Sequence, residues 1–196
     1  MERDYDADTR VYQSDLRPSD EIGRTAGLRA VERVNPRRPA TGSYPVIYDE
    51  RISSGLVGHF LSAINGASIT RGSSWLKDSL GKQVLPSTCK LVENPHRLRA
   101  GASRLFDSEG LATKKREIFS KGVLNGWTLD LASARKLGMK PTANASRNVS
   151  SNPSPTNWNI ELSSPEDYCD NLLSEMGDGL LVTSLIGSTI KPNTGD

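Results

Sequence analysis

A strand and the most informative helix of the chain lie in one stretch, YPVIYDERISSGLVGHFLSAING at residues 44–66. Three apolar residues at 46–48 predict a short strand, and Asp49 is placed to cap a helix that follows it. Apolar residues and one histidine then recur at helical spacing, which predicts an amphipathic helix. Its apolar face carries Ile52, Leu56, His59, Phe60 and Ala63. Asn65 and Gly66 are a typical C-terminal stop signal, so we expect the helix to end there.

On the N-terminal side, residues 1–18 are polar and charged, which predicts an arm or connector. The residues that interrupt any apolar face are Asp4, Asp6 and Asp8. A helix is expected from Ser19, as its cap, to the residue before Pro36. Its apolar positions are Ile22, Ala26, Ala30 and Val34. Three prolines then predict a turn-rich linker, NPRRPATGSYP at residues 35–45.

On the C-terminal side, the chain becomes strand-like from Thr88. Residues 113–119 and 123–131 predict a β-hairpin, which turns through Ser120, Lys121 and Gly122. A brief helical turn is expected at residues 133–138. The Ser-, Asn- and Pro-rich residues 140–157 have no apolar period, so we expect an exposed loop there.

Three further elements are predicted near the end of the sequence. A strand is indicated by Trp158, Ile160 and Leu162, which alternate with Asn157, Asn159 and Glu161. A helix should begin at Ser164-Pro165-Glu166-Asp167 and end at Gly177. Its buried residues should be Leu172, Leu173 and Met176. Residues 180–187, LLVTSLIG, predict a buried strand.

The order of these elements favours the α+β class, with antiparallel sheets and flanking helices, because regular βαβ alternation is absent. A chain of 196 residues and 21.3 kDa is long enough to bury a core without disulfides. Lys and Arg outnumber Asp and Glu by only 25 to 23, so charge gives no support for a nucleic-acid partner. Cys89 and Cys169 lack metal-site spacing and suit a reducing compartment. With no apolar stretch of ~20 residues, we expect a cytoplasmic chain without a membrane partner.

Residue chemistry alone identifies no catalytic apparatus. A zinc site would have to combine His59, His96, a cysteine and an acid from separate segments. No GxSxG, Walker A or GxGxxG motif occurs. Asp107 and Glu109, two apart in a Gly-ended loop, could orient a peptide amine or hold a metal, but we prefer the interpretation that Asp107 caps the turn.

Five longer stretches carry a family resemblance. They are YPVIYDERISSGLVGHFLSAINGASI (44–69), SSWLKDSLGKQVLP (73–86), FDSEGLATKKREIFSKGVLNGWTLDLASARKLG (106–138), PSPTN (153–157) and GDGLLVTSLIGSTIKPNTGD (177–196). In that order they resemble the TldD/PmbA family, once called modulators of DNA gyrase. Within the family, the chain is similar to the PmbA (TldE) branch.

The resemblance implies a subunit of a cytosolic heterodimeric metalloprotease that degrades or trims unfolded or modified peptides. The zinc or similar metal would belong to a TldD-like partner, whose matching helix carries His-Glu-x-x-x-His. Here those three positions are Ser54, Gly55 and His59. A single imidazole cannot hold a catalytic metal, so we expect neither a metal nor another cofactor, and no catalytic residue, in this chain.

The resemblance also sets expectations about extent. Residues 1–40 would be a helical arm and linker from the central region of the family, and residues 41–196 an incomplete C-terminal α+β domain. Family members usually continue beyond the position of Asp196, so we expect an unpaired edge beside residues 180–187 and self-association through it. Many PmbA-type chains carry a histidine in the loop where this one has Asn144.

Peptide capture by strand addition would need little sequence preference, because main-chain hydrogen bonds supply the affinity. The candidate substrate-binding residues are Asp107, Glu109, Asn157 and Asn159. Three alternatives stay open. The chain could be a regulator that acts on gyrase or DNA, an independent hydrolase built from His59, Cys89 and an acid, or an inactive truncated fragment.

Overall fold

Two compact units make up the computed structural model, which describes residues 1–163 and 172–196. The first unit consists of residues 1–43 and 98–101, and the second of residues 44–97 and 102–196. The division into domains at residues 40 and 41 stays a prediction. None of the helices in the described ranges is both long and apolar enough to cross a membrane.

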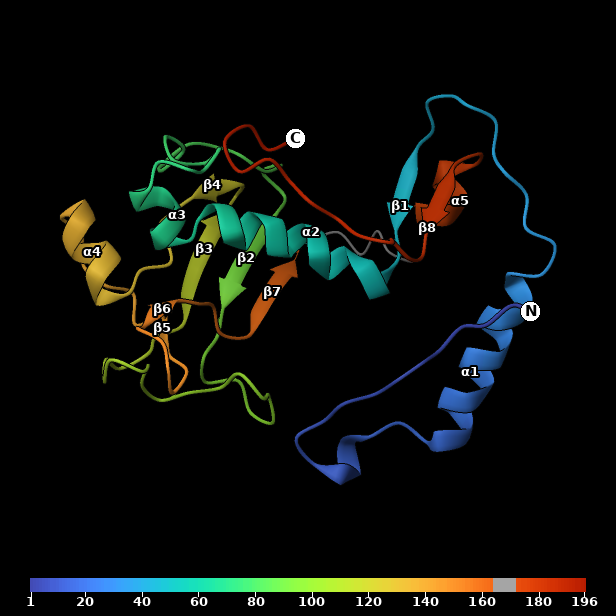
Figure 1. Cartoon of the computed structure of the whole chain (residues 1–196), viewed down its shortest axis with the longest axis horizontal. Helices are drawn as coiled ribbons and strands as arrows, with labels where there is room; N and C mark the ends of the chain where they lie inside the picture. Colours follow the sequence, from blue (N-terminus) through green and yellow to red (C-terminus); the bar gives the residue numbers. More distant parts are fainter. Residues whose placement is uncertain (164–171) are drawn as a thin grey trace. The chain divides into compact units, whose positions relative to one another are not determined.

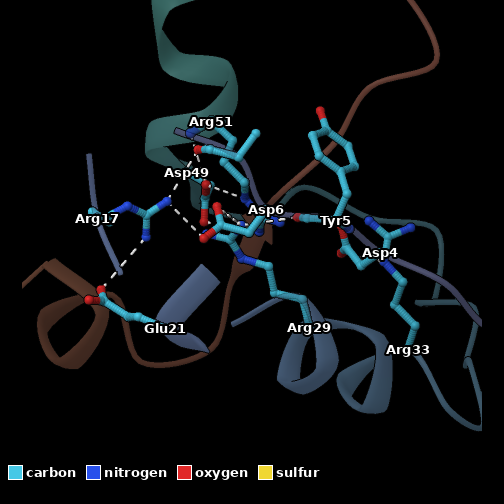
Figure 2. A network of polar contacts seen from close by, with 10 residues as sticks. Asp4, Tyr5, Asp6, Arg17, Glu21, Arg29, Arg33, Asp49 and Arg51 are labelled. Atoms are coloured by element: carbon cyan, nitrogen blue, oxygen red, sulfur yellow. Dashed lines mark hydrogen bonds and ion pairs between the residues drawn. The ribbon is translucent and has the colours of Figure 1, made fainter. Parts of the chain in front are cut away.

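The first unit is a helix held by an acidic segment. The helix α1 spans Ser19–Glu32 and follows the short 3-10 turn Gln13–Asp15, and neither contains a buried residue. We call Asp4, Asp6 and Asp8 the acidic strap, and Figure 2 labels Asp4 and Asp6 beside Arg17, Arg29 and Arg33. Their carboxylates pair with arginines of this unit at 2.8–2.9 Å: Asp4 with Arg33, Asp6 with Arg29 and Arg17, and Asp8 with the Arg17 N–H. Asp4 and Asp6 are two residues apart, so in an extended segment they point to the same side. Arg29 and Arg33 are four apart at the end of α1 and point to one side of it, so each carboxylate faces one guanidinium.

Asp6 lies at the centre of the strap. Desolvation raises the pKa of its carboxyl, but the hydrogen bonds from Arg17 and Arg29 outweigh it, so the pKa lies below its ordinary value. The bond to Asp6 in turn raises the pKa of Arg17. The Asp6 carboxyl is therefore ionised at neutral pH.

The second unit is built on a four-stranded antiparallel sheet of order β4-β3-β2-β7. Its strands are β2 (Lys90–Glu93), β3 (Arg116–Ser120), β4 (Val123–Leu124) and β7 (Ile160–Ser163). The helix α2 (Glu50–Ala63) crosses one face of this sheet (Figure 1). Phe60 of α2 meets Phe119 of β3 edge to face, with ring centroids 5.6 Å apart. The core between them includes Ile64, Leu91, Ile118, Phe119, Leu124 and Leu129, each almost fully buried.

Shorter elements surround this sheet. They are α3 (Gly66–Thr70), α4 (Leu131–Leu137), the antiparallel pair β5 (Ala145–Ser146) and β6 (Ser154–Pro155), the parallel pair β1 (Val46–Tyr48) and β8 (Leu180–Val182), and α5 (Leu172–Met176). The α+β class with antiparallel sheets is confirmed, and β1–β8 is the parallel pair among the strands described above.

Several local predictions are confirmed. The strand lies at residues 46–48, and the Arg51 N–H donates to Asp49 at 2.9 Å, so Asp49 caps α2. The hairpin turns at Lys121 and Gly122, whose φ angles are 49° and 72°. A Cβ at Gly122 would lie 2.0 Å from the Leu85 carbonyl oxygen, so only glycine fits there.

Other boundaries differ from the sequence prediction. The helix α2 ends at Ala63, close to the predicted stop, but Asn65 itself caps the next helix, because its side chain accepts the Ala67 N–H at 3.0 Å. Ser19 is the first residue of α1 rather than its cap, and Val34 lies beyond the helix and is exposed. The second hairpin strand covers only residues 123 and 124, because the chain then turns toward α4.

The expectation of an exposed loop over residues 140–157 holds for residues 147–152, which are exposed, but is wrong at the flanks. Asn144 and Ala145 are fully buried, and β5 pairs with β6 across the segment. The polar composition misled the prediction there because Asn144 Nδ2 donates inside the fold, to Glu93 and to the Thr156 carbonyl. The neighbouring strand is shorter than predicted and starts at Ile160, since Asn159 has a φ of 38°.

The predicted buried strand at residues 180–187 is also wrong. β8 covers only residues 180–182 and pairs with β1 alone among the described strands. Leu185 and Ile186 are exposed, because no described layer covers this part of the chain. Leu172 and Leu173, expected to be buried, are exposed on α5. The predicted helix start at residues 164–167 and Cys169 lie outside the described residues, and self-association stays a prediction.

Candidate functional site

The helix α2 carries the three positions at which the resemblance implies a metal motif in the partner. Ser54 and Gly55 are exposed, and His59 is half-buried. A Cβ placed on Gly55 would meet no atom within 4 Å. The surroundings of α2 therefore leave room for a larger side chain at this position.

His59 lies at the rim of a pocket of about 110 Å³. Its Nε2 shares a hydrogen bond of 2.7 Å with Ser188 Oγ, which ties the C-terminal segment to α2. The other side chains that line the pocket include Ser62, Ser68, Ser73 and Trp75. Hydroxyl groups, an indole and one imidazole can hold a polar group by hydrogen bonds, but this set contains no carboxylate.

This donor set does not fit a catalytic metal. A catalytic zinc takes three nitrogen, sulfur or carboxylate ligands and keeps one open position. Ser54, Gly55 and His59 together supply one imidazole. In residues 1–163 and 172–196, no three His, Cys, Asp or Glu side chains come together.

Neither the zinc site that would combine both histidines nor the independent hydrolase of His59, Cys89 and an acid is assembled in the part of the chain that the structure describes. His96 Nε2 shares a bond of 3.0 Å with Thr113 Oγ1, whereas His59 bonds Ser188. Cys89 is a free, half-buried thiol. Among the described residues, no three His, Cys, Asp or Glu side chains form a group that could hold a metal.

Asp107 organises the loop that contains it. It is buried, and its Oδ1 accepts the N–H groups of Glu109 and Leu111 at 2.9 Å, while its Oδ2 accepts the Ala145 N–H at 3.0 Å. These bonds match the preferred interpretation of Asp107 as a turn cap. Glu109 accepts the Leu131 N–H at 2.8 Å, at the start of α4. A substrate contact by either carboxylate stays a prediction, and every contact found for them is internal.

Asn157 and Asn159 are half-buried and bonded within the chain, although the sequence placed them on an open strand face. Asn157 Nδ2 donates to Glu93 Oε1 at 3.1 Å and to Thr128 Oγ1 at 2.9 Å. Asn159 Nδ2 donates to the Asn94 carbonyl at 3.0 Å and to Ser103 Oγ at 2.8 Å. Their predicted role in substrate binding is untested, but the structure uses both amides to hold loops together.

Sequence reasoning missed the centre of this network, which is Glu93. Its side chain is 1% exposed, yet it is a carboxylate on a core-facing position of β2. Its Oε2 accepts from Arg116 Nε at 2.5 Å. Its Oε1 accepts from the Trp158 N–H and from the amides of Asn144 and Asn157. The signal was the period of two, because Leu91 and Glu93 share the buried face of the strand.

Comparison with known proteins gives one consistent family. A sequence model described as the PmbA/TldA metallopeptidase C-terminal domain matches residues 41–196. The Metalloprotease PmbA of Escherichia coli O157:H7 is 40% identical over all 196 residues, and the Metalloprotease PmbA homolog of Haemophilus influenzae is 37% identical over the same length. The chain spans 42% of the length of each of these relatives.

The fold is also similar to a solved structure. A crystal structure described as a modulator of DNA gyrase from Bacteroides thetaiotaomicron superposes with a TM-score of 0.83 at 29% identity. The match covers 95% of this chain and 40% of that one.

Proposed function

The chain belongs to the TldD/PmbA metallopeptidase family, and from that premise we propose that it is a PmbA/TldE-type subunit, which carries no metal and pairs with a metal-bearing TldD-like subunit to cleave peptides. The metal and the water-activating glutamate belong to the partner. This chain helps to form the compartment that admits an extended peptide.

The observation that carries this proposal is the state of α2. At the three motif positions, a hydroxyl and a glycine replace two of the groups a metal site needs, and His59 is engaged with Ser188 at 2.7 Å. The open space beside Gly55 indicates that packing against the rest of the chain does not require glycine there. The helix therefore keeps the family's architecture while lacking the donor set for the chemistry.

The free edge of the sheet suits the proposed peptide-shaping role. β7 is the edge strand in the order β4-β3-β2-β7 among the described residues, and its Glu161, Leu162 and Ser163 are exposed. An exposed edge offers unpaired main-chain groups to an extended peptide, with little dependence on the peptide's sequence. The substrate path is therefore proposed along β7 rather than along the half-buried asparagines.

The test is to co-express this chain with a TldD-like chain from the same source, to separate the products by size exclusion and to measure zinc by mass spectrometry. The proposal expects co-elution, with zinc in the complex and only background zinc in the isolated chain. Stoichiometric zinc in the isolated chain, or the absence of a complex with a folded partner, would contradict it.

A matched variant tests whether the zinc measurement can detect metal bound to the helix α2. Ser54→His with Gly55→Glu restores the two missing motif residues, and the neighbours of Gly55 leave room for the longer side chain. We expect this variant to retain more zinc after desalting than the parent chain, because it presents two imidazoles on one helix. Glutamate also forms helices better than glycine, so α2 should not lose stability.

A further inference from the structure

A groove between residues 111–116 and 141–143 lies outside the helix α2. It has a volume of about 490 Å³, within the range of small-ligand sites, and lies in the second unit. Its lining residues come from two segments, 111–116 and 141–143. They include three cations and no acid.

Two of these cations are available to a ligand. Arg116 is already paired with Glu93 and also donates to the Trp127 carbonyl and to Thr128. Lys114 and Lys115 are exposed, and neither has an ion pair with any described residue. The groove therefore presents two uncompensated positive charges next to apolar surface from Leu111 and Pro141.

The opposite wall of the groove is held in one conformation. Ala143 has a φ of 58°, which side-chain-bearing residues rarely adopt. The Trp158 indole N–H donates to the Ala143 carbonyl at 3.0 Å, and the Thr142 N–H donates to the Leu129 carbonyl at 3.1 Å. Backbone strain of this kind persists only where the surroundings fix it, and it concentrates at binding sites.

The beginning of β3 marks one end of the groove, because Arg116 is both the first residue of this strand and part of the groove lining. The main-chain carbonyls of the next two residues are already bonded: Asn125 donates its N–H to Ile118 at 2.9 Å and its side-chain amide to Glu117 at 3.2 Å. A ligand here therefore meets the side chains of Lys114 and Lys115 rather than a free strand edge.

We propose that this groove binds an extended peptide segment rich in acidic side chains. The ligand class rests on the proposed function, in which the protein handles peptides. Single-stranded nucleic acid fits less well, because such sites stack bases on aromatic residues and none lines the groove. The groove therefore adds a charge preference to the peptide handling proposed above, in which strand addition along β7 has little selectivity of its own.

The test uses fluorescence anisotropy with the full 196-residue chain and a labelled octapeptide of alternating Glu and Ala. A Lys/Ala octapeptide and a single-stranded oligothymidylate serve as comparison probes. We expect the acidic peptide to bind roughly tenfold more tightly than the basic one. The double variant Lys114→Glu with Lys115→Glu should bind the acidic peptide about tenfold more weakly than the parent chain does. The matched control is Lys77→Glu with Lys82→Glu, which changes the net charge equally on exposed residues outside the groove.

Several results would overturn the inference. These are equal binding of the two peptides, no binding at all, preferential binding of the oligonucleotide, or an equal loss in both double variants. If the charge-reversed variant does not fold, as judged by circular dichroism, Lys114→Gln with Lys115→Gln replaces it and should give a smaller loss in the same direction. The measurement needs neither the TldD-like partner nor zinc, so its failure is distinguishable from failure of the proposed subunit role.

Discussion

The two units of this chain are stabilised by different physics. In the first unit, α1 contains no buried residue, and the acidic strap holds it through paired charges. In the second unit, an apolar core lies between α2 and the sheet, and the ion pair of buried Glu93 with Arg116 sits inside a hydrogen-bond network. Partly exposed ion pairs contribute little and are screened by salt, whereas buried apolar area is not. The stability of the first unit should therefore depend on salt and pH, and the stability of the second unit on the volume of the side chains in its core.

The three tryptophans make this comparison measurable, because Trp75, Trp127 and Trp158 all lie in the second unit. Their fluorescence during urea unfolding reports on that unit alone. Amide hydrogen exchange in α1 reports on the first unit.

The largest effect is expected from Phe119→Ala. Phe119 is fully buried and packs edge to face on Phe60, so its truncation leaves a cavity in the core. We expect the free energy of unfolding to fall by about 3–5 kcal/mol, measured by tryptophan fluorescence in urea. The control is Leu28→Ala on α1, where the side chain is more than half exposed, with an expected change of less than about 0.5 kcal/mol. Equal effects of the two substitutions would remove the contrast between the units.

Glu93→Gln keeps the size of the side chain but removes its charge, and we expect it to lower the free energy of unfolding by about 3 kcal/mol. Arg116 then loses its charged partner. The new amide N–H₂ also faces groups that are themselves donors, such as the Trp158 N–H. The comparison is Glu117→Gln, because Glu117 pairs with Lys90 on the exposed side of the same sheet. That exposed pair should be worth less than about 1 kcal/mol, so a similar loss in both variants would contradict the network argument.

Removing a helix cap should lower the free energy of unfolding by a smaller amount, about 1–2 kcal/mol. Asp130 is buried and accepts the Ser133 N–H at 2.7 Å at the start of α4, so Asp130→Ala should destabilise the second unit by that amount. Asp130→Asn keeps an acceptor and should cost less. Ser19→Ala should leave α1 unchanged, because Ser19 makes no capping bond. A loss of α1 protection in Ser19→Ala would show that the first unit depends on a cap after all.

The smallest effect on overall stability is expected from Asp6→Asn, and it should be confined to α1. Because the folded pKa of Asp6 lies below its ordinary value of 3.8, its contribution is complete above that value and is lost as the pH falls through the lower folded pKa. We expect lower amide protection factors in α1, each taken relative to unstructured amides in the same solution, for the variant, for the parent in 1 M salt and for the parent at acidic pH. The control is Asp20→Asn, at an exposed helix position. Salt-independent exchange in the parent would show that the strap does not hold the helix.

The candidate site was predictable where it depends on which residues occupy a helix. Ser54, Gly55 and His59 could be assigned to α2 from the cap at Asp49 and the apolar period, and the structure places them there. Glu93 and the groove at Lys114 and Lys115 could not be found in this way. Each depends on segments that are far apart in the chain and meet only after the sheet and the β5–β6 pair have formed.

The sequence by itself determined the α+β class, the capped helix α2 and the hairpin at Gly122, because each follows from local spacing, a cap or a required backbone angle. Only the tertiary structure decided where the polar residues lie. The sequence places Asn144 and Asp107 in loops and Asn157 on an open strand face, yet all three lie within the fold because they make hydrogen bonds to partners inside it. Leu185 and Ile186 have the composition of a core strand and stay exposed, because burial requires a covering layer that local sequence does not specify.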